Sequence, residues 1–179
     1  MPTSNLDERI ALIVVDLQQG LAHVQTVHPL RDVAVRAGEL AEAFRTRGLP
    51  VVLVNVIGGG STEFFPELRQ HRGDHVVTKS GISAFHPGTR LTELLATLDV
   101  TQVVVAGVST SKGVESTAQD AHTRGFRITI VRDAITDRMR SAHDHSLQHV
   151  FPGLGQIATV DDIIAALPAG MPPTAEESE

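Results

Sequence analysis

The feature that most constrains the fold is a series of short, continuously apolar runs rich in β-branched residues. An alternating pattern would leave one face of a strand in water, whereas continuous apolarity indicates burial on both faces. The sequence therefore predicts the strands of a parallel sheet that helices cover on both sides. The runs lie at 10–16, 50–56, 74–79, 102–108, 127–133 and, more weakly, 156–160.

Helical patterns fill most of the segments between these runs. The clearest spans 30–47, where apolar residues recur on one face and Gly48 provides a stop. Because right-handed crossovers join parallel strands, we predict an α/β fold: a three-layer, doubly wound, six-stranded and mostly parallel sheet in the order 3-2-1-4-5-6. We expect one domain over residues 1–167 and a flexible tail over 168–179. The other helical patterns lie at 89–98, 113–124 and 142–151.

Composition limits the partners of the chain. The formal net charge is −6, and no Lys/Arg cluster offsets it, so phosphate backbones would be repelled. A stacking platform for single-stranded nucleic acid needs exposed aromatic rings, and the chain has no Trp and no Tyr. No apolar run approaches the roughly 18 residues of a membrane span, and the N-terminus lacks a signal-peptide pattern. We therefore expect a soluble, cytoplasmic protein with no nucleic-acid or membrane partner.

Polar side chains follow three of the predicted strands. In a doubly wound sheet the binding crevice opens at the carboxyl ends of the strands, where the winding reverses. Asp16 ends the first run, Lys79 ends the third, and the small residues of 107–113 follow the fourth and precede a helix. An acid after an apolar strand needs a cation or hydrogen-bond donors. We therefore expect Asp16 and Lys79 to form an ion pair at the crevice, although acids at strand ends also serve as helix caps and structural ion pairs.

Other polar groups have simpler interpretations. The glycine-rich segment 57–62 lacks the Lys-Ser/Thr of a phosphate-binding loop, so we interpret it as a mobile loop. His143, His145 and the histidine at 149 are interpreted as surface or partly packed side chains, with no metal site. No G-x-S-x-G motif surrounds the hydroxyl residues of 109–116, which suit caps and turns.

Three blocks of this sequence resemble those that define the isochorismatase-like hydrolases. They are VVDLQ with Asp16, TKSGISAFHPGTRL with Lys79, and GVSTSKGVESTAQDAHTRGFRITIVRDAITD from Gly107. The resemblance covers residues from about 9 to 167. It implies a small-molecule hydrolase that forms a homodimer or a higher homo-oligomer, and a cis peptide bond between Val108 and Ser109.

The resemblance breaks at the nucleophile. Most members of the family use an Asp, a Lys and a Cys, but Gly113 stands at the cysteine position and the chain has no cysteine. Isochorismatases also carry glycine there and cleave a vinyl ether by acid chemistry. The resemblance thus implies that Asp16 is a general acid in a noncovalent reaction, while Lys79 orients Asp16 or holds a substrate carboxylate.

The same resemblance implies a substrate-binding site and leaves one alternative function open. Ser80, Gly81 and Ile82 replace a Trp-Arg-Tyr triplet of the isochorismatases, so we expect a different, small and anionic substrate, with no cofactor and no metal. The alternative is a catalytically silent member that binds a small ligand or a protein partner. The substrate-binding residues implied by the resemblance are Gln18, Phe85, Val108, Ser109 and Lys112.

Overall fold

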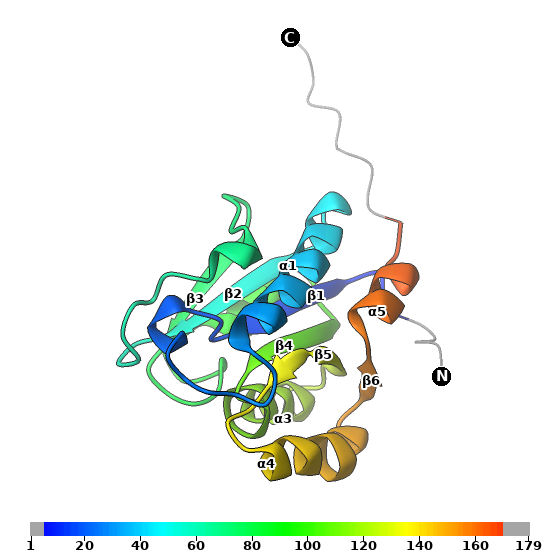
Figure 1. The fold of residues 1–179 in the computed structure, drawn as a ribbon. Helices are drawn as coiled ribbons and strands as arrows, with labels where there is room; N and C mark the ends of the chain where they lie inside the picture. Colours follow the sequence, from blue (N-terminus) through cyan, green and yellow to red (C-terminus); the bar gives the residue numbers. More distant parts are fainter. Residues whose placement is uncertain (1–5, 170–179) are drawn as a thin grey trace.

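The structure is a computed structural model and describes residues 6–169. Its six strands form one sheet in the order β3-β2-β1-β4-β5-β6, with parallel pairing throughout, which confirms the predicted order (Figure 1). Residues 170–179 of the predicted tail lie outside the described residues. The strands are β1 (Ile10–Val15), β2 (Val51–Val56), β3 (His75–Lys79), β4 (Gln102–Val108), β5 (Arg127–Thr136) and β6 (Gln156–Ala158).

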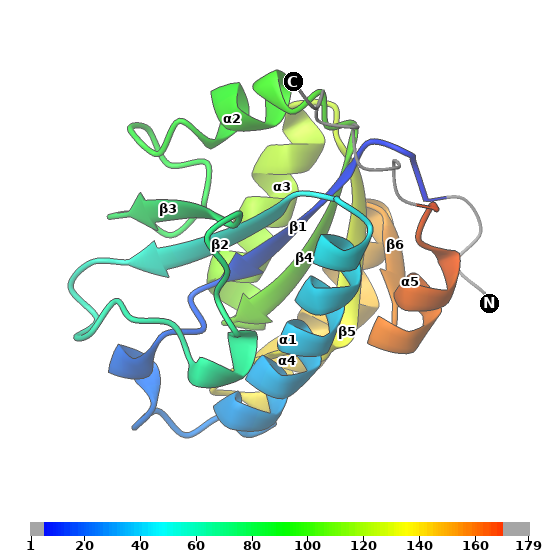
Figure 2. The same ribbon diagram turned by 90° about the horizontal axis from the view of Figure 1, so that it is seen from above.

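Helices cover both faces of the sheet. Figure 2 shows α1 and α5 on one side and α2 and α3 on the other, with the carboxyl ends of β1 to β4 at one edge. No helix within residues 6–169 is long and apolar enough to cross a membrane. The helices are α1 (Leu30–Thr46), α2 (Leu91–Thr97), α3 (Glu115–Thr123), α4 (Arg140–His145) and α5 (Val160–Ala166).

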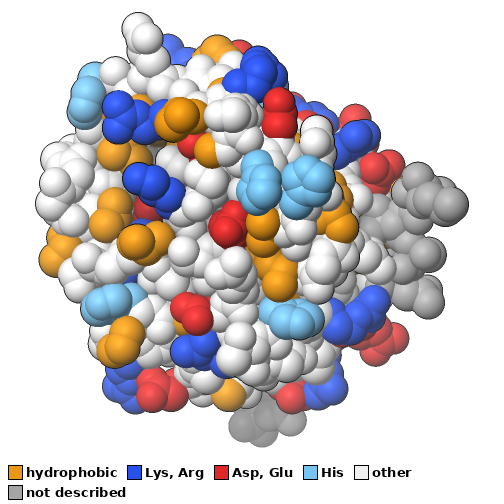
Figure 3. Space-filling view, turned by 90° about the horizontal axis from the view of Figure 1, so that it is seen from below, with side chains coloured by type: hydrophobic (Ala, Val, Ile, Leu, Met, Phe, Trp, Pro, Cys, Tyr) orange, Lys and Arg blue, Asp and Glu red, His pale blue; other side chains and the backbone are white. Residues whose placement is uncertain are grey.

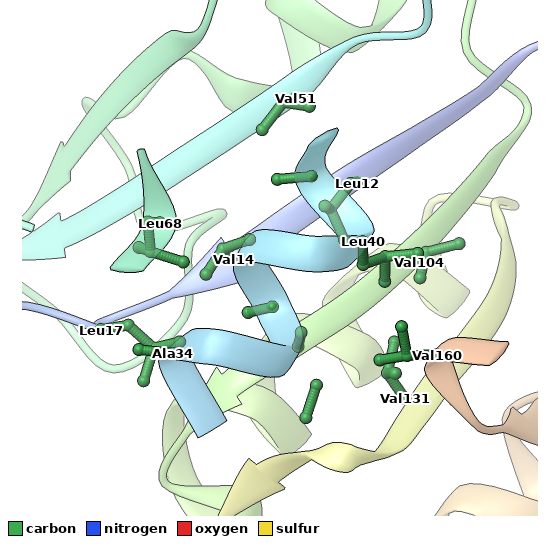
Figure 4. Packing of buried hydrophobic residues seen from close by; sticks show 14 of the residues in the cluster. Leu12, Val14, Leu17, Ala34, Leu40, Val51, Leu68, Val104, Val131 and Val160 are labelled. Atoms are coloured by element: carbon green, nitrogen blue, oxygen red, sulfur yellow. The ribbon is translucent and has the colours of Figure 1, made fainter. Parts of the chain in front are cut away.

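Two aliphatic clusters form the core, one on each face of the sheet. In the cluster under α1, shown in Figure 4, Leu12 and Val104 of the sheet pack with Leu40 of the helix. In the cluster under α2 and α3, Ile13 packs with Leu95 and other buried residues. Each such side chain contributes about 1.5–3 kcal/mol when it leaves water. Burial on both faces explains why the strand sequences are continuously apolar.

Two helices differ from their predicted bounds. The predicted helix over 113–124 is preceded by a π-helical turn, Thr110–Val114, and α3 itself begins at Glu115. The predicted helix over 142–151 begins earlier, as α4, and continues as a π turn over Ser146–Val150.

The helix α5 was not predicted at all. The sequence pattern suggested a strand up to Val160, but β6 ends at Ala158 because Thr159 starts a helix. The Thr159 side chain accepts a hydrogen bond from the Asp162 N–H, and Asp162 accepts one from the Thr159 N–H. This reciprocal capping box is a local signal for a helix N-terminus.

Candidate active site

Asp16 and Lys79 form a buried ion pair at the carboxyl edge of the sheet. Asp16 follows β1 with a left-handed backbone (φ 56°), and its N–H donates to the Val54 carbonyl oxygen at 2.9 Å. Lys79 is the last residue of β3, two strands away. The distance from Lys79 Nζ to Asp16 Oδ2 is 2.8 Å. The predicted pairing is therefore confirmed.

The ammonium of Lys79 has no hydrogen-bonding capacity left. Besides Asp16, Nζ donates to the carbonyl oxygens of Gly81 at 3.1 Å and Ile82 at 2.8 Å. A lysine has three N–H donors, and all three are used here. Lys79 therefore orients Asp16, and a substrate carboxylate would have to break one of these bonds to reach the ammonium.

The electrostatics of Asp16 suit proton transfer near neutral pH. Burial raises the pKa of Asp16 to about 6 from 3.8, and the charge and hydrogen bond of Lys79 oppose that rise. Oδ1 of Asp16 is buried and has no hydrogen-bond partner in the described part of the chain. Since Oδ2 accepts from Lys79, a proton on this carboxyl group would reside on Oδ1.

The turn after β4 brings Gly113 against Asp16. It begins with a cis peptide bond between Val108 and Ser109, as the resemblance implied. A Cβ atom added to Gly113 would lie 3.3 Å from Asp16 Oδ2 and 3.1 Å from Val15 Cγ1. Gly113 thus borders the acid closely, and even a methyl group at this position would crowd Oδ2.

Asp137 fixes one end of this turn. The backbone N–H and the hydroxyl of Ser111 both donate to Asp137 Oδ2 at 2.7 Å, and the Met139 N–H donates to Oδ1 at 3.2 Å. Burial opposes the charge of Asp137, but these hydrogen bonds lower its pKa overall. The carboxylate therefore ties the turn to the segment between β5 and α4.

His143 supports the turn from the other side, a role that sequence reasoning missed. Its side chain is buried, and Nδ1 lies 2.8 Å from Thr110 Oγ1. The interpretation as a surface or partly packed histidine is wrong for this residue. One signal was available, because His143 precedes Leu147 and Val150 at spacings that place all three on one helix face.

The other histidines of this segment are exposed. His145 and the histidine at 149 have ring centroids 5.1 Å apart. Figure 3 views the molecule from below, the side on which α4 lies in Figure 1, and shows histidine and charged side chains there. No group of three or more His, Asp or Glu side chains in residues 6–169 has a geometry suited to a metal ion.

Gln18, a predicted substrate contact, is used by the protein itself. The side chain is fully buried. Its amide nitrogen donates to the carbonyl oxygens of Val56 at 3.0 Å and Ser61 at 3.1 Å, and its Oε1 accepts from the Val56 N–H at 2.8 Å. Gln18 thereby anchors the glycine-rich loop after β2 beside Asp16.

Phe85 is buried in the core. It belongs to the core cluster under α2 and α3, where its ring centroid is 6.2 Å from that of Phe126 and 4.8 Å from the Arg124 guanidinium carbon. Of the other predicted contacts, Val108 is buried, Ser109 is half-buried and Lys112 is exposed. Ser109 and Lys112 are therefore the side chains of this set that remain accessible at the turn.

The family of this chain follows from its similarity to known proteins. The isochorismatase-domain family model matches residues 10–162. The chain belongs to the isochorismatase family. An uncharacterized family protein of Escherichia coli O157:H7, YecD, is 34% identical over 182 residues, covering 88% of this chain and 95% of that protein. An isochorismatase family protein from Burkholderia thailandensis has a TM-score of 0.86 at 33% identity, covering 91% of this chain and 97% of that one.

Two relatives with named activities are an amidohydrolase and an amidase. Maleamate amidohydrolase of Pseudomonas putida is 33% identical over 121 residues, which cover 68% of this chain and 56% of that protein. N-carbamoylsarcosine amidase from Thermoplasma acidophilum has a TM-score of 0.75 at 29% identity, covering 86% of this chain and 97% of that one. Membership of the isochorismatase family therefore indicates that this chain is a hydrolase.

Proposed function

We propose that this protein hydrolyses a small anionic molecule with Asp16 as general acid and without a covalent enzyme intermediate. The observation that carries the proposal is Asp16 itself, which is buried, has a pKa of about 6, and keeps Oδ1 without a partner among the described residues while Lys79 holds Oδ2. A general acid works best when its pKa lies near the working pH. A thiol nucleophile is excluded, since the chain contains no cysteine.

In the proposed reaction, Asp16 gives one proton to the substrate and regains one from water. The proton on Asp16 Oδ1 passes to the substrate, as in protonation of an enol-ether carbon. Water adds to the carbon of the resulting oxocarbenium ion and gives one proton to the Asp16 carboxylate, so the acid is regenerated. The hemiketal formed then collapses: its C–O bond to the leaving group breaks, the hydroxyl proton passes to the leaving oxygen, and a carbonyl compound and an alcohol are released. Lys79 keeps the carboxyl group in place throughout, because its three hydrogen bonds fix Nζ beside Oδ2. Gly113 lies against Oδ2, so a side chain at this position would press on the acid.

Lys112 supports an anionic substrate. It is exposed on the turn next to Gly113, and no ion pair holds its ammonium within residues 6–169. Lys79, by contrast, is already saturated. We therefore assign the charge recognition to Lys112, and we expect Lys112→Gln to raise KM for an anionic substrate more than for its neutral amide.

The test combines a substrate panel with one isosteric variant. Vinyl ethers, carbamoyl amides and pyridine carboxamides are incubated with the pure protein, each as a charged and a neutral member. Asp16→Asn keeps the shape of the side chain and should slow turnover of any substrate found by on the order of 10²- to 10⁴-fold.

Intact-protein mass spectrometry during turnover provides the second readout. No adduct should accumulate on the protein. An adduct on Ser109 or Ser111, or an Asp16→Asn variant at full rate, contradicts the mechanism. Binding of a panel member without turnover supports instead a catalytically silent protein that binds a small ligand.

Assembly into a homodimer or higher oligomer is also part of the proposal. Ile57, Ile82 and Met139 are each more than half exposed (54%, 60% and 63%). These three side chains are the anchors that we assign to the subunit interface. Light scattering at micromolar concentration should give a mass at least twice that of the chain.

A further inference from the structure

A cavity of about 480 Å³ lies outside the candidate active site. It is bounded by the start of α1, the second half of β5, and α4 with the π turn that follows it. Pro29, Val33 and Leu147 supply apolar walls. The volume falls within the range of small-molecule sites, about 300–1,000 Å³.

His143 is the buried polar group on the wall of this cavity. Its side chain is only 3% exposed, and Nδ1 is paired with Thr110 Oγ1. Nε2 has no hydrogen-bond partner among the described residues, although the ring lines the cavity. Nε2 is not one of the fully buried atoms without a partner, so this nitrogen is open to the cavity that the ring lines. The cavity is the place from which a partner can come.

The start of α1 borders the same cavity at Pro29, Asp32 and Val33. This helix has 17 residues, and its N-cap residue, Pro29, makes no side-chain cap. The first-turn N–H groups of such a helix lack intrahelical acceptors and attract negative charge. The helix N-terminus and the free Nε2 of His143 are independent features that both favour a hydrogen-bond acceptor in the cavity.

Arg132 supplies the charge for an anion. Its side chain lines the cavity and forms no ion pair within the described residues. The neighbouring Arg36 is already engaged, since it pairs with Asp133 at 2.7 Å and with Glu39. Asp32, also on the wall and without an ion-pair partner in the same residues, opposes a second negative charge. The wall therefore fits one carboxylate rather than a dianion.

We propose that this cavity is a second ligand site, for a small apolar monocarboxylate, and that its occupant is linked to the active-site turn through His143. The carboxylate pairs with Arg132 and accepts the Nε2–H of His143, while the apolar body packs on Val33 and Leu147. Fixing the proton on Nε2 leaves Nδ1 as an acceptor, so the Thr110 hydroxyl must donate to it. Occupancy thus selects one tautomer and one orientation of Thr110.

The environment of His143 supports a neutral ring that can respond in this way. Burial lowers the pKa of His143, and the neighbouring His28, whose ring centroid lies 5.4 Å away in an edge-on arrangement, acts in the same direction. A neutral imidazole has one donor and one acceptor nitrogen, and the hydrogen bond at one nitrogen decides the state of the other. The link from cavity to turn is therefore a single side chain.

The test uses sodium benzoate as the probe and isotope-labelled full-length protein. Benzoate should give saturable NMR shifts of the His143 ring and of the Thr110 and Ser111 amides, whereas benzamide, its neutral analogue, should not. Arg132→Gln should weaken benzoate binding at least tenfold. The matched control is Arg72→Gln, an exposed arginine without an ion pair in residues 6–169, which should bind as the parent does.

His143→Asn separates binding from linkage, because its short amide can still reach Thr110 but cannot replace Nε2. This variant should lose benzoate affinity and the shifts of the turn, while its spectrum without benzoate remains that of a folded protein. The absence of saturable shifts, equal binding of benzamide, unchanged binding by Arg132→Gln, or shifts that stop at His143 would overturn the proposal. No substrate or turnover is needed, so the result is independent of the role of Asp16.

Discussion

Lys79 Nζ lies 2.8 Å from Asp16 Oδ2, and the two carbonyl oxygens of Gly81 and Ile82 complete its hydrogen bonds. Two opposing effects therefore act on the pKa of Asp16. Burial disfavours the charged carboxylate, while the ammonium favours it, and burial prevails because the pKa of Asp16 is raised to about 6.

Replacing Lys79 with Met should raise the pKa of Asp16 above 6, because the charge and hydrogen bond that lower it disappear while burial remains. The ¹³C chemical shift of the Asp16 carboxyl carbon, followed against pH, measures this directly. Lys112→Met is the matched control: it removes an exposed ammonium that is not among the causes of the shift, so it should leave the titration unchanged. A lower Asp16 pKa in Lys79→Met would contradict the assignment.

The pH dependence of turnover should report how Asp16 is used. A general acid must be protonated, so kcat/KM should fall about tenfold per pH unit above the Asp16 pKa of about 6. A general base would give the opposite slope below that pH. Initial rates between about pH 4.5 and 8.5, on the substrate that the panel identifies, distinguish the two. A rise in rate through the Asp16 pKa rules out the acid role.

Asp16 should also make the stability of the protein depend on pH. Its pKa is about 6 in the folded protein and 3.8 in the unfolded reference, so the folded state binds the proton more tightly. This contribution to the free energy of unfolding is fully present below about pH 3.8 and is lost as the pH rises to about 6. The loss is on the order of 3 kcal/mol.

Denaturant unfolding of the parent and of the Asp16→Asn variant at several pH values checks this sign. The amide introduced by Asp16→Asn cannot ionise, so the parent should lose stability relative to the variant between about pH 4 and pH 7. The difference in the free energy of unfolding between parent and variant could instead stay constant over this range, or grow in favour of the parent. Either result would show that burial does not dominate the pKa of Asp16.

Ser111→Ala should loosen the turn that carries Gly113. The hydroxyl of Ser111 donates to the buried Asp137 carboxylate at 2.7 Å, and hydrogen bonds to charged groups contribute about 1.5–3 kcal/mol. The free energy of unfolding should fall by about that amount, and the pKa of Asp137 should rise. Ser116→Ala, at a half-buried serine whose hydroxyl forms no hydrogen bond within residues 6–169, should change stability by less than about 0.5 kcal/mol.

The sheet and the ion pair were predictable because both follow from local patterns. Continuous apolar runs define the strands, and parallel strands bring their carboxyl ends to one edge, so Asp16 and Lys79 were expected to meet. The assignment of Gly113 to the cysteine position came from the resemblance of the third block to the family, and it stays a prediction. The structure places Gly113 against Asp16.

The partners of these residues were not predictable. Thr110 and His143 are 33 positions apart, and their contact depends on how α4 packs against the turn after β4. The resemblance implied that Gln18 contacts the substrate, but its amide is hydrogen-bonded to the backbone of Val56. Side-chain direction at a strand end depends on tertiary packing, which the spacing of residues along the chain does not encode.

Gly113→Ala tests whether the space beside the acid is needed. The added Cβ would lie 3.1 Å from Val15 Cγ1 and 3.3 Å from both Asp16 Oδ2 and the Val108 carbonyl oxygen, which is tighter than an ordinary van der Waals contact. Crowding of this kind in a packed interior costs typically about 1–3 kcal/mol. The methyl group would also press on the carboxyl group that the proposed mechanism uses as the acid. The variant should therefore lose stability in this range and most of its turnover.

Gly73→Ala is the matched control, because a Cβ there meets no heavy atom within 4 Å and its φ lies outside the left-handed range. Its turnover and its free energy of unfolding should stay close to those of the parent. Thermal unfolding and kcat, measured for both variants, separate crowding from function. If Gly113→Ala unfolds at a lower temperature yet keeps the parent kcat, the space beside Asp16 Oδ2 is not part of the reaction site, and the proton must leave Asp16 in another direction. If Gly113→Ala retains both the unfolding temperature and the kcat of the parent, the turn moves away from Asp16 more readily than its anchors at Ser111 and Thr110 imply.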